Sequence, residues 1–266
     1  MPPRIPVARP QDEKAGRRLP PHATLDRYYA DEEEHRHFLD SIFETTARHY
    51  DRLNFLVSLG SGGFYRRSAL RRAGLREGMS TLDVAAGTGL VAQAARALVG
   101  ASGGVIGLDR SMGMLAESRR ALDIPLVQGA AERLPFRGGS FDFLSMGYAL
   151  RHVTDLEVTF REYFRVLKRG GTVLILEFAR PRSGPGYALG RLYLKRLVPW
   201  LARIRSGSRE AELLMTYCWE TVENCVPGEL ILDALGRNGF KDARRVAWFG
   251  IFVEYVARKP EPDPRM

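Results

Sequence analysis

The chain has 266 residues, of which 45% are hydrophobic and 27% are charged, and its formal net charge is +9. This length and composition predict one large globular α/β domain with a sizeable core. The positive charge permits an anionic partner but does not choose between nucleic acid and a membrane surface. The spacing of Cys218 and Cys225 fits neither a redox pair nor a zinc site, so we expect no metal.

The sequence contains no apolar stretch near the roughly 18 residues that span a bilayer and no secretion signal at its start. The expected location is therefore the cytoplasm. Residues 1–22 are proline-rich and basic, which predicts a disordered arm, and residues 259–266 form a similar tail. Residues 23–79 are expected to form an N-terminal helical cap, with residues 40–59 helical, before a main domain over residues 80–258.

Segments typical of strands and helices alternate within this domain. Strands are predicted at 80–85, 104–109, 124–128, 141–146 and 172–178, and the last of these is hydrophobic enough to be central. Helices are predicted at 90–99, 111–121 and 154–168, and Gly170-Gly171 is expected to end the third. Alternation with short links predicts a parallel, doubly wound sheet.

A longer segment interrupts this alternation after the strand at 172–178. Residues 185–226 are predicted to be a mostly helical insertion. A helix at 227–238 and two strand-like runs, 243–247 and 251–257, complete the domain.

The strongest local signal is the glycine-rich turn Asp83-Val-Ala-Ala-Gly87-Thr-Gly89-Leu-Val-Ala92, which joins a predicted strand to a predicted helix. Gly87 suits a tight turn, Gly89 allows a ligand close to the main chain, and the small Ala92 allows close packing. Asp109 ends the next strand, where a carboxylate can accept both ribose hydroxyls. The pattern predicts an adenosine-containing ligand at the carboxyl edge of the sheet.

Asp83 discriminates between the two usual ligands of such a turn. A dinucleotide would place its diphosphate near this carboxylate and be repelled, whereas the sulfonium and ammonium of S-adenosylmethionine would be attracted. The sequence therefore predicts S-adenosylmethionine as the cofactor.

The stretch Leu82–Gly89 resembles motif I of class I methyltransferases. The chain further resembles the C-methyltransferases of ubiquinone and menaquinone biosynthesis over about residues 42–258. The similar stretches are Tyr50–Asn54, Ser58–Gly60, Ala131–Phe136, Phe141-Asp142, Ala149–Asp155, Arg165–Gly171 and Leu176–Phe178.

The resemblance implies a Rossmann-like, seven-stranded, mostly parallel sheet with an antiparallel last strand. The turn and the resemblance together give these cofactor-binding candidates: Asp83, Ala85, Gly87, Thr88, Gly89, Asp109, Arg110, Met114, Ala130, Ala131 and Gly147. The chain departs from the family where Ala130 stands for Asn or Asp, where His152 stands for Asn, and near Gly147, where a hydroxyl residue is usual.

The catalytic candidates are Arg151, His152 and Tyr50. Methylation of an aromatic carbon needs a ring hydroxyl to lose its proton, which His152 could accept and Arg151 could favour through its charge. A salt bridge to a nearby acid is the alternative for Arg151, and a bond to backbone or solvent is the alternative for His152. By resemblance, Tyr50 and Asp51 belong to a helix that closes over the cofactor.

Residues 180–205 carry seven basic residues and no acid, with apolar residues interleaved at helical spacing. This pattern is compatible with an interfacial helix that gives peripheral membrane contact through 185–205, with a lid over the substrate, and with a packed helix that has a solvated basic face. The sequence leaves these three interpretations open.

The predicted function is S-adenosylmethionine-dependent methylation of a quinone precursor or related phenol, on carbon. The alternatives are methylation of a secondary metabolite or polyketide on oxygen or carbon, an NAD(P)-dependent oxidoreductase, and a non-catalytic cofactor-binding protein. A nucleic-acid methyltransferase is disfavoured because Gly147–Leu150 lacks the Asn/Asp-Pro-Pro-aromatic motif. The sequence leaves a homo-oligomer open.

Overall fold

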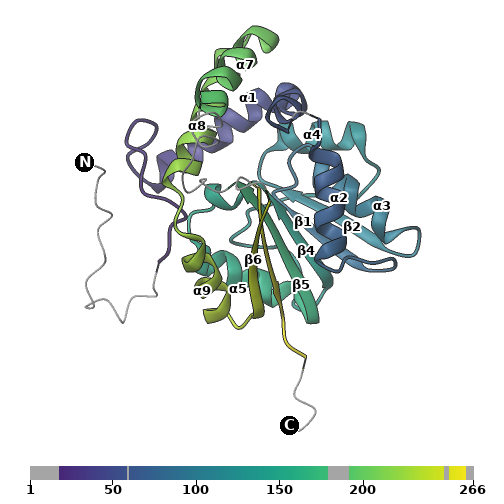
Figure 1. Ribbon diagram of the computed structural model, residues 1–266. Helices are drawn as coiled ribbons and strands as arrows, with labels where there is room; N and C mark the ends of the chain where they lie inside the picture. The colour runs from purple at the N-terminus through teal and green to yellow at the C-terminus, as the bar shows by residue number, and fades with distance from the viewer. Residues whose placement is uncertain (1–17, 59, 179–191, 249–251, 262–266) are drawn as a thin grey trace, which may run out of the picture.

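The computed structural model describes residues 18–58, 60–178, 192–248 and 252–261. They form a seven-stranded sheet with the order β3-β2-β1-β4-β5-β7-β6. Helices cover both faces of the sheet, and a further group of helices caps one end (Figure 1). The Rossmann-like fold predicted from the sequence is confirmed.

The first five strands are parallel to one another: β1 (Ser80–Val84), β2 (Gly104–Asp109), β3 (Leu126–Gln128), β4 (Phe141–Gly147) and β5 (Leu167–Phe178). The last strand, β7 (Phe252–Arg258), is antiparallel to β5, and β6 (Lys241–Trp248) pairs with β7 at the edge. β5 lies inside the sheet and is buried from Gly171 to Glu177, as its hydrophobic sequence predicts.

The prediction that Gly170-Gly171 end a helix is wrong, because these two glycines lie inside β5. The preceding helix, α5 (Leu156–Val166), ends earlier. Lys259 pairs with the glycines, donating from its backbone nitrogen to Gly171 and accepting from Gly170. Pairing across the sheet thus extends the strand where the local sequence favours a helix end.

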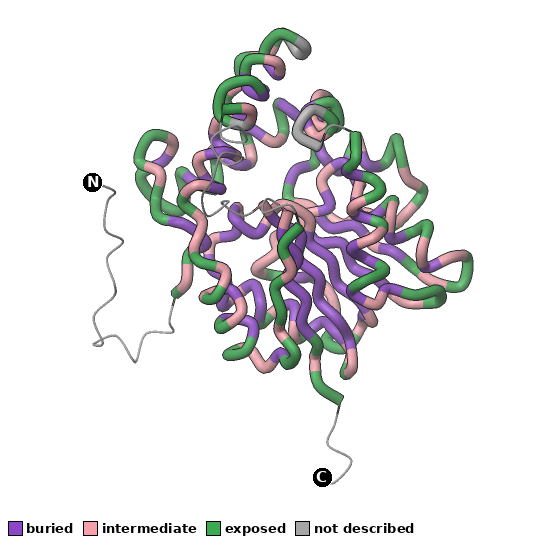
Figure 2. Tube along the Cα trace, in the orientation of Figure 1, coloured by how far each residue is buried: buried purple, intermediate pink, exposed green. Residues whose placement is uncertain are grey.

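Helices on both faces bury the sheet. α2 (Gly62–Arg72) and α3 (Leu90–Val99) pack with Leu174 and Leu176 on one face. α5 and α9 (Gly228–Arg237) pack with Val173 and Ile175 on the other. Neighbouring residues of β5 point to opposite faces because side chains alternate along a strand. Figure 2 shows the buried residues concentrated in the strands.

The cap consists of α1 (Glu32–Ser58), η2 (Tyr193–Leu197), α7 (Val198–Ser206) and α8 (Arg209–Asn224). α1 starts earlier than the predicted 40–59. Ile42, Leu53, Val198 and Leu214 form a separate small core between these helices. The part of the predicted insertion before residue 192 lies outside the described residues. None of the described helices has the length and apolar character needed to cross a bilayer.

Part of the segment expected to be a disordered arm is bound to the domain. Residues 1–17 lie outside the described residues, but Leu19 accepts a hydrogen bond from the backbone nitrogen of Leu156, and Pro21 accepts one from Val226. His22 forms an isolated antiparallel bridge with Cys225. These backbone bonds cannot be predicted from the composition of the arm, because any residue with a free carbonyl or N–H can form them.

Candidate active site

The glycine-rich turn between β1 and α3 has the backbone shape that its glycines permit. Gly87 has a φ of 58° and Gly89 one of 91°, and Ala85 also has a positive φ of 53°. A Cβ at Gly89 would lie 2.5 Å from Leu122 Cδ1 and 2.7 Å from Ser118 Oγ. A side chain at this position would therefore clash with α4 (Met112–Ala121), which explains the glycine.

Asp109, at the end of β2, is held by two backbone amides. Gly87 donates to Oδ2 at 2.7 Å and Ser111 donates to Oδ1 at 2.9 Å. Burial raises the pKa of Asp109, and these amide bonds oppose that rise. The carboxylate is fixed beside the turn, where the sequence predicts the ribose.

Asp83 lies fully buried beneath the turn. Its Oδ1 accepts a 2.7 Å hydrogen bond from Ser145 Oγ, while its Oδ2 has no partner. Burial raises the pKa of Asp83 to about 7. An orphaned carboxylate oxygen of this kind fits a cationic ligand, because a nearby positive charge stabilises the ionised form. The carboxylate of Asp83 thus suits the positively charged sulfonium and ammonium groups of S-adenosylmethionine.

A cleft of about 860 Å³, open solvent at its mouth included, runs along the carboxyl edge of the sheet. This is within the usual size range of small-molecule sites. Its two halves have different linings. Around the turn the cleft is lined by Ala85, Gly87, Leu108, Asp109, Arg110, Ser111, Met114, Gly129, Ala130, Ala131, Glu132, Met146 and Gly147. Beside α1 it is lined by Arg36, Leu39, Asp40, Phe43, Tyr50, Tyr148, Ala149, His152, Val153 and Thr154.

One wall of the cleft is α1, which polar contacts fix to the loop after β2. Asp40 forms a 2.6 Å ion pair with Arg110. Glu44 accepts hydrogen bonds of 2.8 Å from Ser111 Oγ and from the backbone nitrogen of Gly113. Apart from Tyr50, the residues that α1 adds to the cleft were not predicted from the sequence. Their helical spacing is visible in the sequence, but it does not show what that face covers.

His152 follows β4 in the short helical turn η1 (Leu150–His152). Its ring is half-buried and lies between Phe43, 5.3 Å away edge-on, and Tyr217, stacked at 5.6 Å. Burial, and then the charge of Arg151, lower the pKa of His152 well below its usual value. Its Nδ1 is buried without a partner. The imidazole is therefore held neutral, in the state that can accept a proton.

Arg151 does not line the cleft, although the sequence suggested a direct catalytic role. It is buried, and its Nη1 forms a 2.7 Å ion pair with Glu177 Oε2 and a 2.9 Å bond to the carbonyl of Tyr148. Its Nε donates to Thr221 Oγ1 at 3.1 Å. The alternative of a salt bridge describes this residue better. Arg151 holds Tyr148, which has a φ of 60°, in the wall of the cleft.

Tyr50, the third catalytic candidate, does line the cleft. Burial raises the pKa of its hydroxyl to about 12. Its ring lies next to the turn, 4.0 Å from where a Cβ of Gly87 would stand. A protonated phenol in this position can donate a hydrogen bond but cannot act as a base near neutral pH.

Most of the residues predicted from the sequence meet in this one cleft. The lining includes Tyr50, Ala85, Gly87, Asp109, Arg110, Met114, Ala130, Ala131, Gly147 and His152. Four predicted residues do not line it: Asp83, Thr88, Gly89 and Arg151. Of these, Asp83 is buried beneath the turn, and Thr88 and Gly89 belong to the turn itself.

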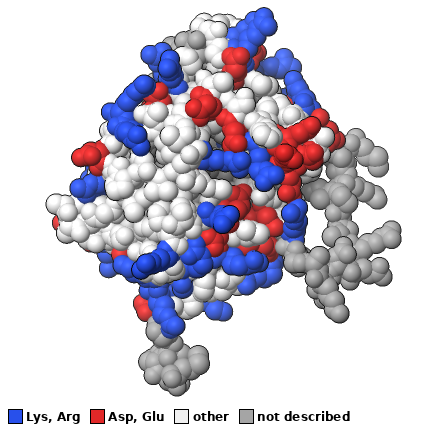
Figure 3. Space-filling model, turned by 180° about the vertical axis from the view of Figure 1, so that it is seen from behind, with Lys and Arg blue, Asp and Glu red and all other residues white. Residues whose placement is uncertain are grey.

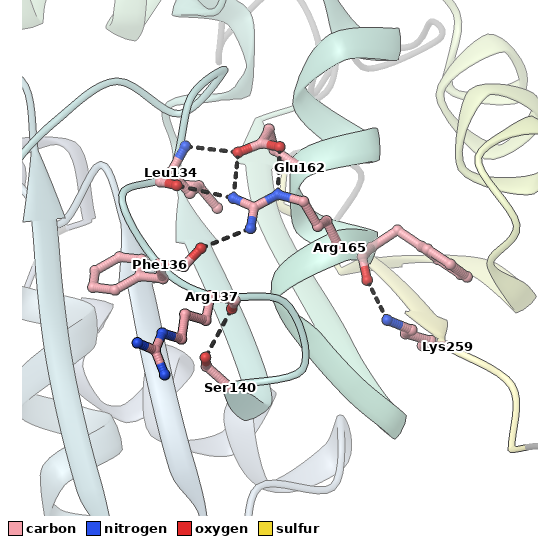
Figure 4. A network of polar contacts seen from close by, with 8 residues as sticks. Leu134, Phe136, Arg137, Ser140, Glu162, Arg165 and Lys259 are labelled. Carbon is pink, nitrogen blue, oxygen red and sulfur yellow. Dashed lines mark hydrogen bonds and ion pairs between the residues drawn. The ribbon is translucent and has the colours of Figure 1, made fainter.

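Two of the stretches that resemble the methyltransferase family hold the site together from outside the cleft (Figure 4). Arg165 donates to the carbonyls of Leu134 and Phe136 and forms an ion pair with Glu162. Glu162 accepts in turn from the backbone nitrogen of Leu134 at 2.8 Å. These bonds clamp the loop after Ala131 to α5, so these stretches position the cofactor side of the cleft.

Comparison with known proteins agrees with this geometry. The model of the ubiE/COQ5 methyltransferase family matches residues 30–252. A ubiquinone/menaquinone biosynthesis C-methyltransferase of Coxiella burnetii is 34% identical over 208 residues, which cover 76% of this chain and 82% of that protein. A demethylmenaquinone methyltransferase of Streptomyces griseus is 33% identical over 226 residues, which cover 85% of this chain and 94% of that protein.

Solved structures show the same fold at low sequence identity. A SAM-dependent methyltransferase of Thermotoga maritima aligns with a TM-score of 0.58 and 23% identity, over 83% of this chain and 99% of its own. One of Aquifex aeolicus aligns with a TM-score of 0.55 and 17% identity, over 73% of this chain and 89% of its own. The chain belongs to the ubiE/COQ5 methyltransferase family and is an S-adenosylmethionine-dependent methyltransferase.

Proposed function

We propose that this protein methylates a ring carbon of a hydroxylated quinone precursor in its reduced, phenolic form. The observation that carries the proposal is the half of the cleft beside α1. Aromatic side chains of Phe43, Tyr50 and Tyr148 line it next to the neutral imidazole of His152. Such a lining suits a flat aromatic acceptor with one ionisable hydroxyl.

The chemistry requires the acceptor to lose a proton before its ring becomes nucleophilic. S-adenosylmethionine, when bound, supplies a methyl group on a positively charged sulfur. His152 takes the proton of the ring hydroxyl, which raises the electron density at the neighbouring ring carbon. A carbon–carbon bond forms as the sulfur–methyl bond breaks. The ring carbon then loses its hydrogen as a proton, so one proton is released for each methyl transferred.

The protonated hydroxyl of Tyr50 can donate a hydrogen bond to an oxygen of the acceptor, which would fix the orientation of the ring. The names of the relatives support the class of acceptor, since one refers to ubiquinone and menaquinone biosynthesis and the other to demethylmenaquinone. Ala130 and His152 differ from the residues usual in the family, and both line the cleft. These two positions are where we expect the acceptor preference of this chain to arise.

The test is an assay with isotopically labelled S-adenosylmethionine and a short-tailed demethylmenaquinol. We expect a product that is one methyl group heavier, with the label on a ring carbon when the product is fragmented. The same compound in its oxidised quinone form is the control and should not react, because it has no hydroxyl proton to lose. A label on oxygen, or equal reaction of both forms, would contradict the proposal.

We also propose that η2 and α7 contact a membrane surface from which such an acceptor is taken. Four large apolar side chains are exposed here: Leu192 (59%), Leu197 (42%), Trp200 (56%) and Ile204 (59%). Exposed Lys195, Arg196 and Arg203 accompany them. Apolar and basic residues on one exposed helical segment suit an anionic bilayer surface. Figure 3 shows the molecule from behind, and on that side acidic and basic side chains are interspersed.

Liposome flotation tests this contact. The intact protein should float with vesicles that contain anionic lipid and less well with purely zwitterionic vesicles. Trp200→Glu and Ile204→Glu should reduce flotation. Phe64→Glu is the matched control, because Phe64 is 82% exposed but lies on α2. No binding by the intact protein, or an equal loss in the control, would reject the membrane contact.

A further inference from the structure

Arg66 on α2 is a buried cation whose printed contact in the described part of the chain is with the ring of Tyr148, not with an anion. Arg66 is only 6% exposed. It forms no hydrogen bond or ion pair with any residue in the described part of the chain. Arg151 is buried to the same degree but pairs with Glu177 at 2.7 Å. Buried charges in proteins are usually paired with an opposite charge. A buried guanidinium without an anionic partner among the described residues therefore indicates an anion-binding site.

The position of Arg66 relates it to the cofactor turn. α2 packs against α3, the helix whose N-cap is Gly89. The guanidinium carbon lies 5.9 Å from the ring centroid of Tyr148, which lines the cleft. The charge of Arg66 also opposes the rise in the pKa that burial causes in both Asp83 and Tyr148.

Asp83 supplies the complementary half of the arrangement. Its Oδ2 is buried and has no partner, and the residue is fully buried below the turn. The guanidinium of Arg66 lies at the ring of Tyr148, just after β4, and the unpartnered oxygen of Asp83 lies in the paired part of β1. An α-amino acid carries an ammonium and a carboxylate on one carbon, and it matches such a pair of opposite charges. The amino acid tail of the cofactor has these two groups.

We propose that Arg66 binds the α-carboxylate of S-adenosylmethionine, while Asp83 faces its positively charged groups. In this arrangement the guanidinium fixes the amino acid end of the cofactor and Asp109 fixes the ribose. No anionic side chain pairs with Arg66 in the described part of the chain, so a bound carboxylate would add an electrostatic bond between α2 and the cofactor. The same residue sits at the face of Tyr148, which connects cofactor binding to the acceptor half of the cleft.

The test compares two ligands that differ in the amino acid tail. S-adenosylhomocysteine carries it, whereas 5′-methylthioadenosine has the adenosine and the sulfur but no amino acid. We expect Arg66→Gln to weaken binding of S-adenosylhomocysteine by about ten- to hundredfold in calorimetry, the range for a lost hydrogen bond to a charged group. Binding of 5′-methylthioadenosine should stay unchanged. The affinity of Arg66→Lys for S-adenosylhomocysteine should lie between those of the wild type and Arg66→Gln. The lysine keeps the charge but loses the two parallel N–H donors of the guanidinium.

Arg67→Gln is the matched control, since Arg67 is exposed and lies next to Arg66 on the same helix. It should bind both ligands as the wild type does. Urea unfolding without ligand gives a second readout: Arg66→Gln should be at least as stable as the wild type, because it removes an unpaired buried charge.

Equal loss of both ligands, or unchanged affinity for S-adenosylhomocysteine, would overturn the assignment. A clear loss of stability in the ligand-free Arg66→Gln protein, with the ratio of the two affinities unchanged, would show a structural role instead. The experiment uses no methyl acceptor, so its outcome is independent of the identity of the substrate.

Discussion

The hydroxyl of Thr88, in the turn between β1 and α3, donates a 2.5 Å hydrogen bond to Oδ1 of Asp51 on α1. This bond connects the capping helix directly to the turn that holds the cofactor. Together with the Asp40–Arg110 ion pair and the bonds to Glu44, it gives α1 three polar attachments to the cofactor half of the site. A ligand enclosed between α1 and the turn can leave only when some of these bonds break.

Asp51→Ala should therefore speed the release of S-adenosylhomocysteine. A net contribution of about 0.5–1.5 kcal/mol corresponds to a roughly two- to tenfold faster dissociation, which stopped-flow fluorescence can measure. Thr88→Val should have a similar effect, and the double variant should not be additive, because both remove one bond. Arg52→Ala, at the exposed neighbouring position, is the control. Fully additive effects would show that the two residues act separately.

His152→Gln should lower the turnover number strongly, with little change in the affinity for S-adenosylhomocysteine. The glutamine keeps a polar side chain between Phe43 and Tyr217 but cannot take up a proton near neutral pH. General bases contribute about 10²–10⁴-fold to rate, so a loss within that range is expected. Steady-state kinetics with the reduced acceptor, together with calorimetry, separate the two effects. Equal turnover in the variant would exclude His152 as the base.

The pH profile of the wild type tests the same residue in another way. The pKa of His152 is lowered well below 6.5, so the imidazole stays neutral as the pH falls from 8 to 6.5. The turnover number should therefore show no loss from protonation of His152 in this interval, and the fall should come at lower pH. A fall in the turnover number that is centred near pH 6.5 and disappears in His152→Gln would contradict the lowered pKa of His152.

The sequence predicted the fold well because the buried strands are short apolar runs with clear ends. β2 and α3 match their predicted limits residue for residue, and β1 ends one residue early. The error at Gly170-Gly171 arose because two glycines are typical of a helix end. Their pairing with Lys259 involves a residue almost ninety positions away, which local sequence does not reveal.

The cofactor half of the site was predictable for the same reason, since its residues follow strands at one edge of the sheet. In the acceptor half only Tyr50 and His152 were predicted, because the other lining residues depend on where α1 lies in space. Arg66 and Arg151 show the limit most clearly. Both are arginines in a chain with 40 basic residues. Only their burial and their partners separate a proposed ligand contact from a structural ion pair.

His35 should make the protein sensitive to acid. It lies between Tyr29, stacked at 4.2 Å, and the hydroxyl of Tyr217, 3.2 Å from its Nε2. Burial lowers its pKa to about 4 in the folded state, against about 6.5 when unfolded. The unfolded chain therefore binds more protons between these values. The contribution of His35 to stability is complete above pH 6.5 and falls by about 1.4 kcal/mol per pH unit down to about pH 4.

Urea unfolding at pH 7.5 and pH 5.5 measures this effect. The wild type should lose about 1 kcal/mol more between the two conditions than His35→Gln does. His22 and His152 also have lowered pKa values, but they are present in both proteins and their contributions largely cancel. His37→Gln is the control, because its side chain is 78% exposed on the same helix. The same pH dependence in all three proteins would contradict the prediction.

The ion pair between Arg151 and Glu177 should matter for folding more than its exposed counterparts. Both side chains are buried, at 5% and 4% exposure, so removing one partner leaves the other charge in the interior. Arg151→Met should lower the free energy of unfolding by about 3–5 kcal/mol. Arg120→Met, which removes an exposed pair with Glu117, should lower it by less than about 1 kcal/mol.

The double variant Arg151→Met/Glu177→Leu separates a structural pair from a catalytic charge. It should be more stable than Arg151→Met alone, because no unpaired charge remains in the core. Urea denaturation of the three proteins gives the comparison. If Arg151→Met were as mild as Arg120→Met, the ion pair would contribute little to the fold. The buried guanidinium would then have to be explained by its effect on the acceptor, as the sequence alone first suggested.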